Sequence, residues 1–189
     1  MEANATPSSS EHILDTITLG GGCYWCVEAI YQRLDGVQSV VSGFSGGSIK
    51  NPSYREVCTG STGHAEVVQI VYDKKKTSLE DILKVFFTVH DPTTLNQQGA
   101  DVGTQYRSVI FFRNAEQEKA SREIIAALDK TGAYPSKIVT EVSPFTAFYK
   151  AEDYHQNYYN EHGYEPYCRI VIQPKIEKFE KVFKERLKH

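Results

Sequence analysis

A run of three glycines and two cysteines at positions 20–26 constrains the fold of this chain more than any other feature. The preceding segment, 13–19, is largely apolar and predicts a strand. The following segment carries apolar residues at helical spacing, namely Tyr24, Val27, Ile30, Tyr31 and Leu34. Successive glycines allow the sharp bend that a direct change from strand to helix requires. The sequence therefore predicts a strand-to-helix junction with Cys23 at the first turn of the helix.

A cysteine at such a junction has the chemistry of a nucleophile. The first helical turn leaves backbone N–H groups unpaired, and the helix dipole favours negative charge there. We therefore expect Cys23 to be ionised at neutral pH, with a sulfur that the neighbouring glycines leave uncovered. Tyr24 and Trp25 can form an apolar wall beside that sulfur. Cys26 follows at a spacing that allows two sulfurs to form a disulfide or share a metal.

The composition indicates an ordinary globular chain of 189 residues. We expect residues 1–10, which are small and polar, to form a disordered leader and residues 11–189 to form a single catalytic domain. A net charge of −3 gives no reason to expect nucleic acid as a partner, and no apolar run is long enough to predict a membrane span. No secretory signal pattern is evident, which favours the cytoplasm, where a C-x-x-C motif is usually catalytic or metal-binding.

The order of expected elements indicates an α+β fold. Strands or extended segments are expected at 13–20, 37–44, 65–72, 106–112 and 137–142. Helices are expected at 24–34, 79–89, 115–129, 152–161 and 176–187. This order predicts a ferredoxin-like, split βαβ core, in which helices pack on a mixed sheet, followed by a C-terminal extension. Two long polar loops, 45–63 and 91–103, are expected to be functional and to lie near Cys23.

Further side chains are suited to proton transfer. Glu66 should share one side of its strand with Val68, and a carboxyl in apolar surroundings has a raised pKa and can act as a general acid. The alternative for Glu66 is an exposed position at a strand end. Tyr54 and Tyr106 lie in or beside the long loops, although most tyrosines only pack with the hydroxyl at the surface. Asp101 lies in a turn-like stretch, where an aspartate usually serves to stabilise the turn.

Two other classes of protein fit parts of this pattern. Four side chains could supply zinc ligands: Cys23, Cys26, Cys58 and His64. Structural zinc sites, however, more often show a second closely spaced ligand pair. A thioredoxin-like dithiol-disulfide oxidoreductase also has C-x-x-C at a helix start, but its motif usually has Trp where this chain has Gly22. His90 is expected to cap a helix end as a cation.

A set of longer motifs is spread between Leu19 and Lys175. They are GGCYW (21–25), SGFSGG (42–47), NPSYREVCTG (51–60), TGHAEVV (62–68), GTQYRS (103–108) and AEDYHQ (151–156), with Tyr167-Cys168 and Pro174-Lys175. In combination these motifs resemble the peptide-methionine (S)-S-oxide reductases, the methionine sulfoxide reductase A family. The resemblance implies thiol-dependent reduction of methionine S-sulfoxide, free or in proteins, without bound metal or cofactor. It also implies thioredoxin as the reductant. We expect the protein to be a monomer.

The resemblance assigns roles to the residues that match its motifs. Cys23 corresponds to the nucleophile, Tyr24 and Trp25 to the pocket for the substrate methyl group, Glu66 to the proton donor, Tyr54 and Tyr106 to the tyrosines that bind the sulfoxide oxygen, and Asp101 to a supporting carboxylate. Glu66, Tyr54 and Tyr106 would supply three hydrogen-bond donors to the sulfoxide oxygen, which leaves only when its negative charge is neutralised. The sulfenic acid formed on Cys23 would then condense with a second thiol.

The chain departs from the family pattern at two positions. Tyr24 stands where the family usually has Phe, so its hydroxyl must find a partner or open water at the pocket rim. Cys26 stands where other residues are common, which indicates a subgroup in which this cysteine resolves the sulfenic acid. Cys168 is the alternative resolving thiol. We favour Cys26, with Cys168 relaying the disulfide outward and Cys58 serving a structural purpose.

Overall fold

The computed structural model describes residues 13–189, so the expected leader at residues 1–10 lies outside it. The strands are β1 (Leu14–Gly20), β2 (Val37–Ser45), β3 (Ala65–Asp73), β4 (Gln97–Gln98), β5 (Asp101–Val102), β6 (Val109–Phe112), β7 (Glu141–Pro144) and β8 (Tyr149–Lys150). The α-helices are α1 (Tyr24–Tyr31), α2 (Tyr54–Cys58), α3 (Leu79–Val89), α4 (Ala115–Thr131), α5 (Tyr158–His162) and α6 (Gln173–Val182). Single 3₁₀ turns lie at Thr104–Tyr106, Asp153–His155 and Lys184–Arg186, and a π-helical turn, Cys168–Ile172, leads into α6.

Six strands form one mixed sheet in the order β7-β6-β1-β3-β2-β8. β1 and β2 are both antiparallel to β3, which lies between them, so β1-α1-β2 is a βαβ unit split by a third strand. β3-α3-β6 repeats the pattern around β1. β7 pairs in parallel with β6 and makes the sheet mixed. The ferredoxin-like, split βαβ arrangement predicted from the sequence is confirmed.

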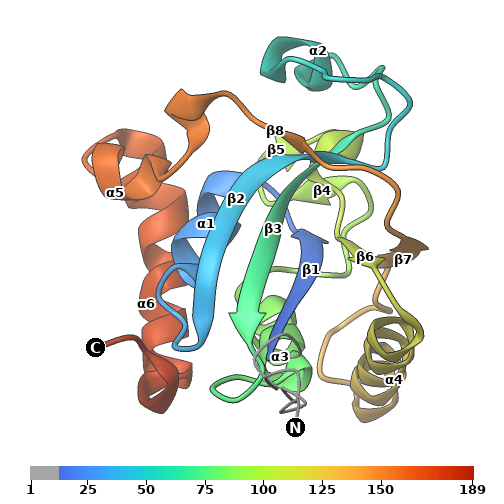
Figure 1. Ribbon diagram of the computed structural model, residues 1–189, viewed down its shortest axis with the longest axis vertical. Helices are drawn as coiled ribbons and strands as arrows, with labels where there is room; N and C mark the ends of the chain where they lie inside the picture. The colour runs from blue at the N-terminus through green and yellow to red at the C-terminus, as the bar shows by residue number, and fades with distance from the viewer. Residues whose placement is uncertain (1–12) are drawn as a thin grey trace, which may run out of the picture.

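The helices cover the sheet unequally (Figure 1). Residues of α1, α3 and α6 share one large apolar core with the side of β1 and β3 that carries Leu19 and Val68. On the other side, a smaller cluster around Val67 and Phe111 is covered by Phe145 and Phe148. The segment containing α5 and α6 lies along the β2 edge of the view, and α4 lies along the β7 edge. Within residues 13–189 no helix combines the length and apolar character that a bilayer span requires.

Several expected boundaries are wrong for identifiable reasons. The helix expected at 152–161 is broken into a 3₁₀ turn and α5, because Asn157 adopts a left-handed conformation with φ of +59°. The final helix begins earlier than expected and ends at Val182. The strand expected at 106–112 begins only at Val109, and the strand expected at 137–142 is β7 at Glu141–Pro144.

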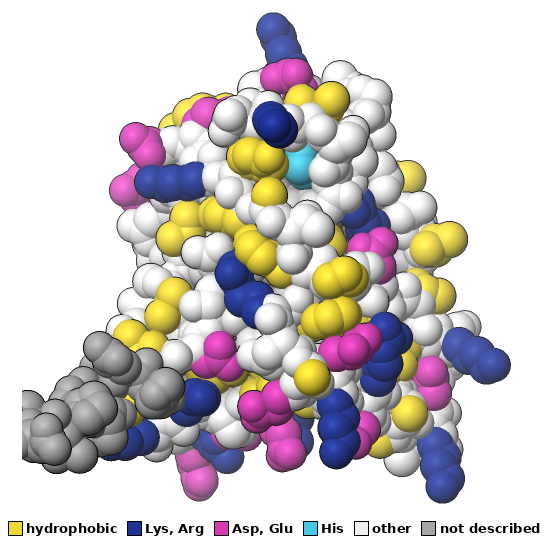
Figure 2. All heavy atoms as spheres, turned by 45° about the vertical axis from the view of Figure 1, so that its right-hand side comes forward, with side chains coloured by type: hydrophobic (Ala, Val, Ile, Leu, Met, Phe, Trp, Pro, Cys, Tyr) yellow, Lys and Arg dark blue, Asp and Glu magenta, His cyan; other side chains and the backbone are white. Residues whose placement is uncertain are grey.

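The two long loops contain structure of their own. The loop 45–63 includes α2, whose N-terminus is closed by a reciprocal pair of hydrogen bonds between Ser53 and Glu56. The loop 91–103 includes the β4–β5 hairpin. Figure 2 shows hydrophobic side chains in a broken band across the middle of one face, with acidic and basic side chains most numerous below the band and a few above it.

Candidate active site

The junction between β1 and α1 places Cys23 as expected, at the N-terminus of the helix. Cys23 is the residue before the first helical residue, with φ and ψ of −61° and 129°. Gly22 has φ of +89°, and a Cβ atom added to it would lie 2.7 Å from the side chain of Gln98. A residue other than glycine is therefore disfavoured at position 22 for two reasons: the backbone has a positive φ, and a Cβ atom would lie too close to Gln98. The close contact also shows that the loop 91–103 covers the junction, as the sequence analysis predicted.

Cys23 itself is buried, with 8% of its surface exposed, so the expectation of an uncovered sulfur is wrong. Burial raises the pKa of the Cys23 thiol well above its usual value, and its hydrogen bond with Cys26 raises it further. A backbone hydrogen bond from Trp25 at the helix N-terminus opposes this shift without overcoming it. The expected ionised Cys23 is therefore a protonated thiol in the unliganded protein, because the cost of burying charge exceeds the effect of the helix end.

Cys26 is the more acidic member of the pair. Its hydrogen bond with Cys23 lowers its pKa, and the ammonium of Lys175 and the phenol of Tyr167 lower it further. Cys26 is also buried. The two sulfurs thus share a hydrogen bond in a closed site, in which negative charge is better accommodated on Cys26 than on Cys23.

Glu66 lies on β3 on the side of the sheet that carries Val68 and Ile70, as the strand alternation predicted. It is 1% exposed, and its Oε1 accepts a hydrogen bond of 3.2 Å from the backbone N–H of Tyr24. Its Oε2 is buried and has no hydrogen-bond partner among residues 13–189. Burial raises the pKa of Glu66 to about 8. Glu66 therefore holds its proton at neutral pH, directly beside the residue that follows Cys23.

Tyr24 lies in a box of aromatic rings and is fully buried. Its ring centroid is 5.7 Å from that of Phe44, 5.4 Å from that of His155 and 6.4 Å from that of Tyr54. Its hydroxyl has no hydrogen-bond partner in the described part of the chain. The structure therefore meets neither expectation for this hydroxyl, because it is neither paired nor open to water at a rim.

Tyr54 is the first residue of α2 and lies half-buried over Tyr24. Its backbone N–H donates to Glu152 across 98 residues of sequence, which fixes the start of the helix above the site. Burial raises the pKa of its phenol, and a hydrogen bond with Cys58 raises it further. Cys58 is exposed at the end of α2, so the expectation that it is a structural cysteine lacks support from its packing.

Tyr106 and Asp101 complete the set of expected residues. Tyr106 is half-buried in the 3₁₀ turn that packs against β3; burial raises its pKa, and the charges of Glu66 and Cys23 add to this shift. Asp101 accepts a hydrogen bond of 2.6 Å from the hydroxyl of Tyr167, which also faces Cys26. The structure thus brings Cys23, Glu66, Tyr54, Tyr106 and Asp101 to one end of the sheet from five separate elements.

The set of zinc ligands considered above is not assembled. His64 lies in hydrogen bonds with the N–H of Gly47 and the carbonyl of Ile49. Cys58 is exposed at the surface. No group of three or more potential ligands among residues 13–189 is placed to hold a metal ion.

Comparison with known proteins places this geometry in a family. The profile described as "Peptide methionine sulfoxide reductase" matches residues 15–187. A protein of Saccharolobus solfataricus named peptide methionine sulfoxide reductase MsrA is 54% identical over 175 residues, 93% of this chain and 98% of its own length. A Trichodesmium erythraeum protein of the same name is 51% identical, over 93% of this chain and 99% of its own. The chain belongs to the peptide methionine sulfoxide reductase family.

Solved structures of this family share the fold. Methionine sulfoxide reductase A of Corynebacterium diphtheriae matches with a TM-score of 0.77 and 37% identity, covering 82% of this chain and 79% of its own. Mxr1 of Saccharomyces cerevisiae in reduced form matches with a TM-score of 0.75 and 33% identity, covering 87% of this chain and 92% of its own. The ferredoxin-like core therefore coincides with that of known reductases.

Three residues that contact the predicted site residues were not singled out from the sequence, namely His155, Tyr158 and Tyr167. Trp25 donates its indole N–H to Nδ1 of His155 at 3.1 Å and stacks on Tyr158 with ring centroids 3.7 Å apart. Tyr167 lies between Asp101 and Cys26. The only sequence signal for His155 and Tyr167 is their place in the family motifs, and Tyr158 lies in none of these motifs.

The unpaired hydroxyl of Tyr24 predicts an unusual stability effect. A buried polar group without a partner costs about 1–3 kcal/mol, so Tyr24→Phe should raise the free energy of unfolding by about 1 kcal/mol. Urea denaturation measures this change. Tyr31→Phe is the matched control, because the buried Tyr31 hydroxyl donates to the carbonyl of Ile82 at 2.7 Å and its removal should destabilise the protein. A loss of stability in Tyr24→Phe would contradict the account.

Proposed function

We propose that this chain reduces methionine S-sulfoxide, free or in proteins, with Cys23 as the nucleophile and Glu66 as the proton donor. The observation that carries the proposal is the neutral, buried carboxyl of Glu66, one oxygen of which has no hydrogen-bond partner in the described part of the chain and lies near Cys23. A sulfoxide oxygen carries partial negative charge and leaves only when it is neutralised. A carboxyl that keeps its proton near neutral pH and has a free oxygen in the site is suited to supply it.

The reaction divides into two steps that conserve atoms and electrons. The Cys23 sulfur attacks the sulfoxide sulfur while Glu66 protonates the oxygen, and the phenols of Tyr54 and Tyr106 donate hydrogen bonds to it. The thiol proton of Cys23 passes to Glu66, and the protonated oxygen then moves from the substrate sulfur to the Cys23 sulfur as the bond between the two sulfurs breaks. Methionine leaves with the electron pair of its sulfur restored, and Cys23 is a sulfenic acid. The pKa of Cys23 is raised in the unliganded site, so this proton transfer accompanies the attack rather than preceding it.

Two aromatic side chains suit the methyl group of the substrate. Tyr24 is fully buried, and Trp25 is held by His155 and Tyr158. A rigid aromatic wall accepts an S-methyl group and excludes larger polar substituents. Two sulfoxide epimers place different substituents against this wall, so the site discriminates between them. Asp101 acts through Tyr167 rather than on the substrate.

Cys26 is our candidate for the resolving thiol. It already shares a hydrogen bond with Cys23, and its lowered pKa favours the thiolate that attacks a sulfenic acid. The product is a Cys23–Cys26 disulfide and water. Cys168 is buried near Cys26. Burial raises the pKa of Cys168 most, and the charge of Cys26 is among the smaller effects that raise it further. We propose that Cys168 relays the disulfide to a reductant, and that Cys26 assigns the chain to the subgroup with a second cysteine in the motif.

The resolving thiol predicts a separable defect. Cys26→Ser should still release one methionine per chain in a single turnover, since Cys23 is intact. Steady-state activity with thioredoxin should fall at least about tenfold, because the sulfenic acid has no thiol within the same turn. Stopped-flow kinetics and product analysis measure both quantities. Full thioredoxin-linked activity in this variant would transfer the resolving role to Cys168.

We propose a thioredoxin as the physiological reductant and the reducing cytoplasm as the compartment. A C-x-x-C motif is more often catalytic than structural in a reducing compartment, which agrees with the redox use proposed for Cys23 and Cys26. The related Mxr1 has also been solved in complex with Trx2. We take residues 11–189 as one catalytic unit.

The proposed function is tested by an assay on both methionine sulfoxide epimers with dithiothreitol as reductant. We expect the S epimer to be reduced and the R epimer to remain. Reduction of the R epimer alone, or of neither, would overturn the proposal. Reduction of insulin disulfides without any sulfoxide-dependent activity would instead favour the thioredoxin-like alternative.

A further inference from the structure

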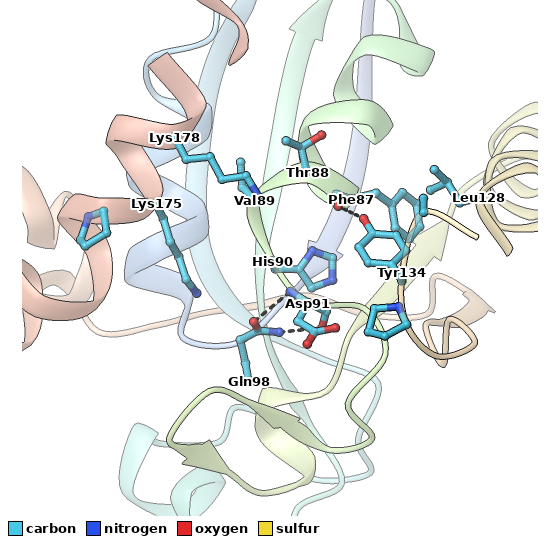
Figure 3. A pocket seen from close by; sticks show the side chains of 13 residues that line it. Phe87, Thr88, Val89, His90, Asp91, Gln98, Leu128, Tyr134, Lys175 and Lys178 are labelled. Carbon is cyan, nitrogen blue, oxygen red and sulfur yellow. Dashed lines mark hydrogen bonds between the residues drawn. The ribbon is translucent and has the colours of Figure 1, made fainter. Parts of the chain in front are cut away.

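A hollow of about 680 Å³ lies between the end of α3, the start of α6 and the segment that follows α4 (Figure 3). We call it the α3–α6 cleft and define it by six of its lining residues, Val89, His90, Asp91, Tyr134, Lys175 and Lys178. Its volume is that of a site for a small molecule. None of the residues assigned above to sulfoxide binding lines it. The cleft is therefore a hollow separate from the residues proposed to bind the sulfoxide.

The cleft adjoins the cysteine pair through a narrow cavity of about 10 Å³. Val89, His90 and Lys175 line both spaces. The narrow cavity reaches Cys26, whereas Cys23 does not line it. It has room for about one water molecule, and the long side chain of Lys175 is the wall that can move aside. A group in the cleft can thus approach Cys26 without passing Cys23.

Positively charged side chains outnumber negatively charged ones around the cleft. Figure 3 shows Lys175 and Lys178 extending from α6 toward the hollow. Neither ammonium has a carboxylate within ion-pair distance in the part of the chain that the structure describes. Asp91 contributes one carboxylate, which accepts two hydrogen bonds from Thr93. The cleft therefore offers two cations and one anion.

His90 adds hydrogen bonding but no charge. Its Nδ1 bonds to the carbonyl of Phe86, so this nitrogen carries the proton, and its Nε2 pairs with the hydroxyl of Ser108. Burial lowers the pKa of His90 to about 4, so the expectation of a cationic cap is wrong. The polar selectivity of the cleft is then set by the two lysines and Asp91.

We propose that the α3–α6 cleft binds a small thiol of tripeptide size that carries two carboxylates and one ammonium group, and that it directs the sulfur of this thiol to Cys26. The two carboxylates complement Lys175 and Lys178, and the ammonium group complements Asp91. This inference rests on the proposed function, because it presupposes the Cys23–Cys26 disulfide.

The electron balance of the step is complete with two such thiols. The first thiolate attacks the Cys26 sulfur from the side away from Cys23. The Cys23–Cys26 bond breaks, and Cys23 takes up the proton of Glu66 as it leaves, because its raised pKa disfavours a free thiolate. A mixed disulfide between Cys26 and the small thiol remains. A second thiol attacks the sulfur of the bound small molecule, frees Cys26 and leaves as the oxidised dimer of the small thiol. The enzyme gains two electrons and two protons.

The test measures the rate at which the oxidised enzyme is reduced by glutathione, the probe with the required charges, and by neutral 2-mercaptoethanol. Lys178→Gln should slow the glutathione reaction about three- to tenfold and change the 2-mercaptoethanol reaction less than twofold. Lys181→Gln, an exposed lysine one turn further along α6, is the matched control and should change neither. Cys168→Ser should retain the glutathione reaction, since the cleft leads to Cys26 directly.

The outcomes separate this inference from the proposed function. Oxidation of the enzyme by one equivalent of methionine S-sulfoxide, with release of methionine, establishes the proposed function before any thiol is added. If that step succeeds but Lys178→Gln leaves the glutathione rate unchanged, or slows both thiols equally, the cleft inference is overturned alone. Loss of the glutathione reaction in Cys168→Ser would also overturn it.

Discussion

Cys23→Ser should abolish methionine sulfoxide reduction, with a loss of more than about 10⁴-fold in the first turnover, because a serine hydroxyl cannot replace the sulfur that attacks the sulfoxide. Serine preserves the size of the side chain and the hydrogen bond to the neighbouring thiol, so the fold should remain intact. Methionine release from the S-sulfoxide under single-turnover conditions measures the loss, and thermal unfolding checks the fold.

The matched control for this loss is Cys58→Ser. Cys58 is exposed at the end of α2, and a serine there keeps a hydrogen-bonding group beside Tyr54. We expect it to retain most of the activity. A Cys23→Ser protein that still releases methionine would contradict the assignment of the nucleophile.

Glu66→Gln should lower the first-turnover rate about 10²- to 10⁴-fold, which is the usual contribution of a general acid. The amide still accepts the hydrogen bond from Tyr24, so the geometry around Cys23 is kept. The unsubstituted enzyme should also lose activity as pH rises through about 8, because the carboxyl holds its proton below its raised pKa and releases it above. The variant should lack this alkaline limb.

Glu28→Gln provides the comparison for the pH profile. Glu28 is a second buried carboxyl, with its pKa raised to about 7 by burial, and it bonds to Ser42 and to the N–H of Tyr158 rather than to the residues beside Cys23. We expect this variant to keep the fall in rate near pH 8. If Glu66→Gln kept that fall, or if Glu28→Gln removed it, Glu66 would not be the proton donor.

The parts of this account that the sequence predicted depend on local patterns. The strand-to-helix junction at Cys23 follows from glycines between two periodicities, and the side of the sheet on which Glu66 lies follows from strand alternation. The order of strands and helices was enough to predict the split βαβ core. Each of these signals is contained in a short window of sequence.

The parts that the sequence did not predict depend on contacts between distant residues. Trp25 and His155 are 130 positions apart, and Tyr167 meets Asp101 across 66 positions. The protonation state of Cys23 also depends on distant residues, because the loop 91–103 covers the junction at Gly22. Burial raises the Cys23 pKa by more than the helix N-terminus, from which a thiolate was predicted, lowers it. Asn157, which breaks the expected helix, adopts a conformation that most residues avoid.

The most direct test of the central claim follows the sulfoxide oxygen. The Cys26→Ser, Cys168→Ser double variant removes both candidate resolving thiols, so an oxygen transferred to Cys23 should stay there as a sulfenic acid. After one equivalent of methionine S-sulfoxide without reductant, peptide mass spectrometry should find one added oxygen atom on Cys23 and one methionine released per chain. Methionine release with an unmodified Cys23, or with the oxygen on Cys58, would contradict the account.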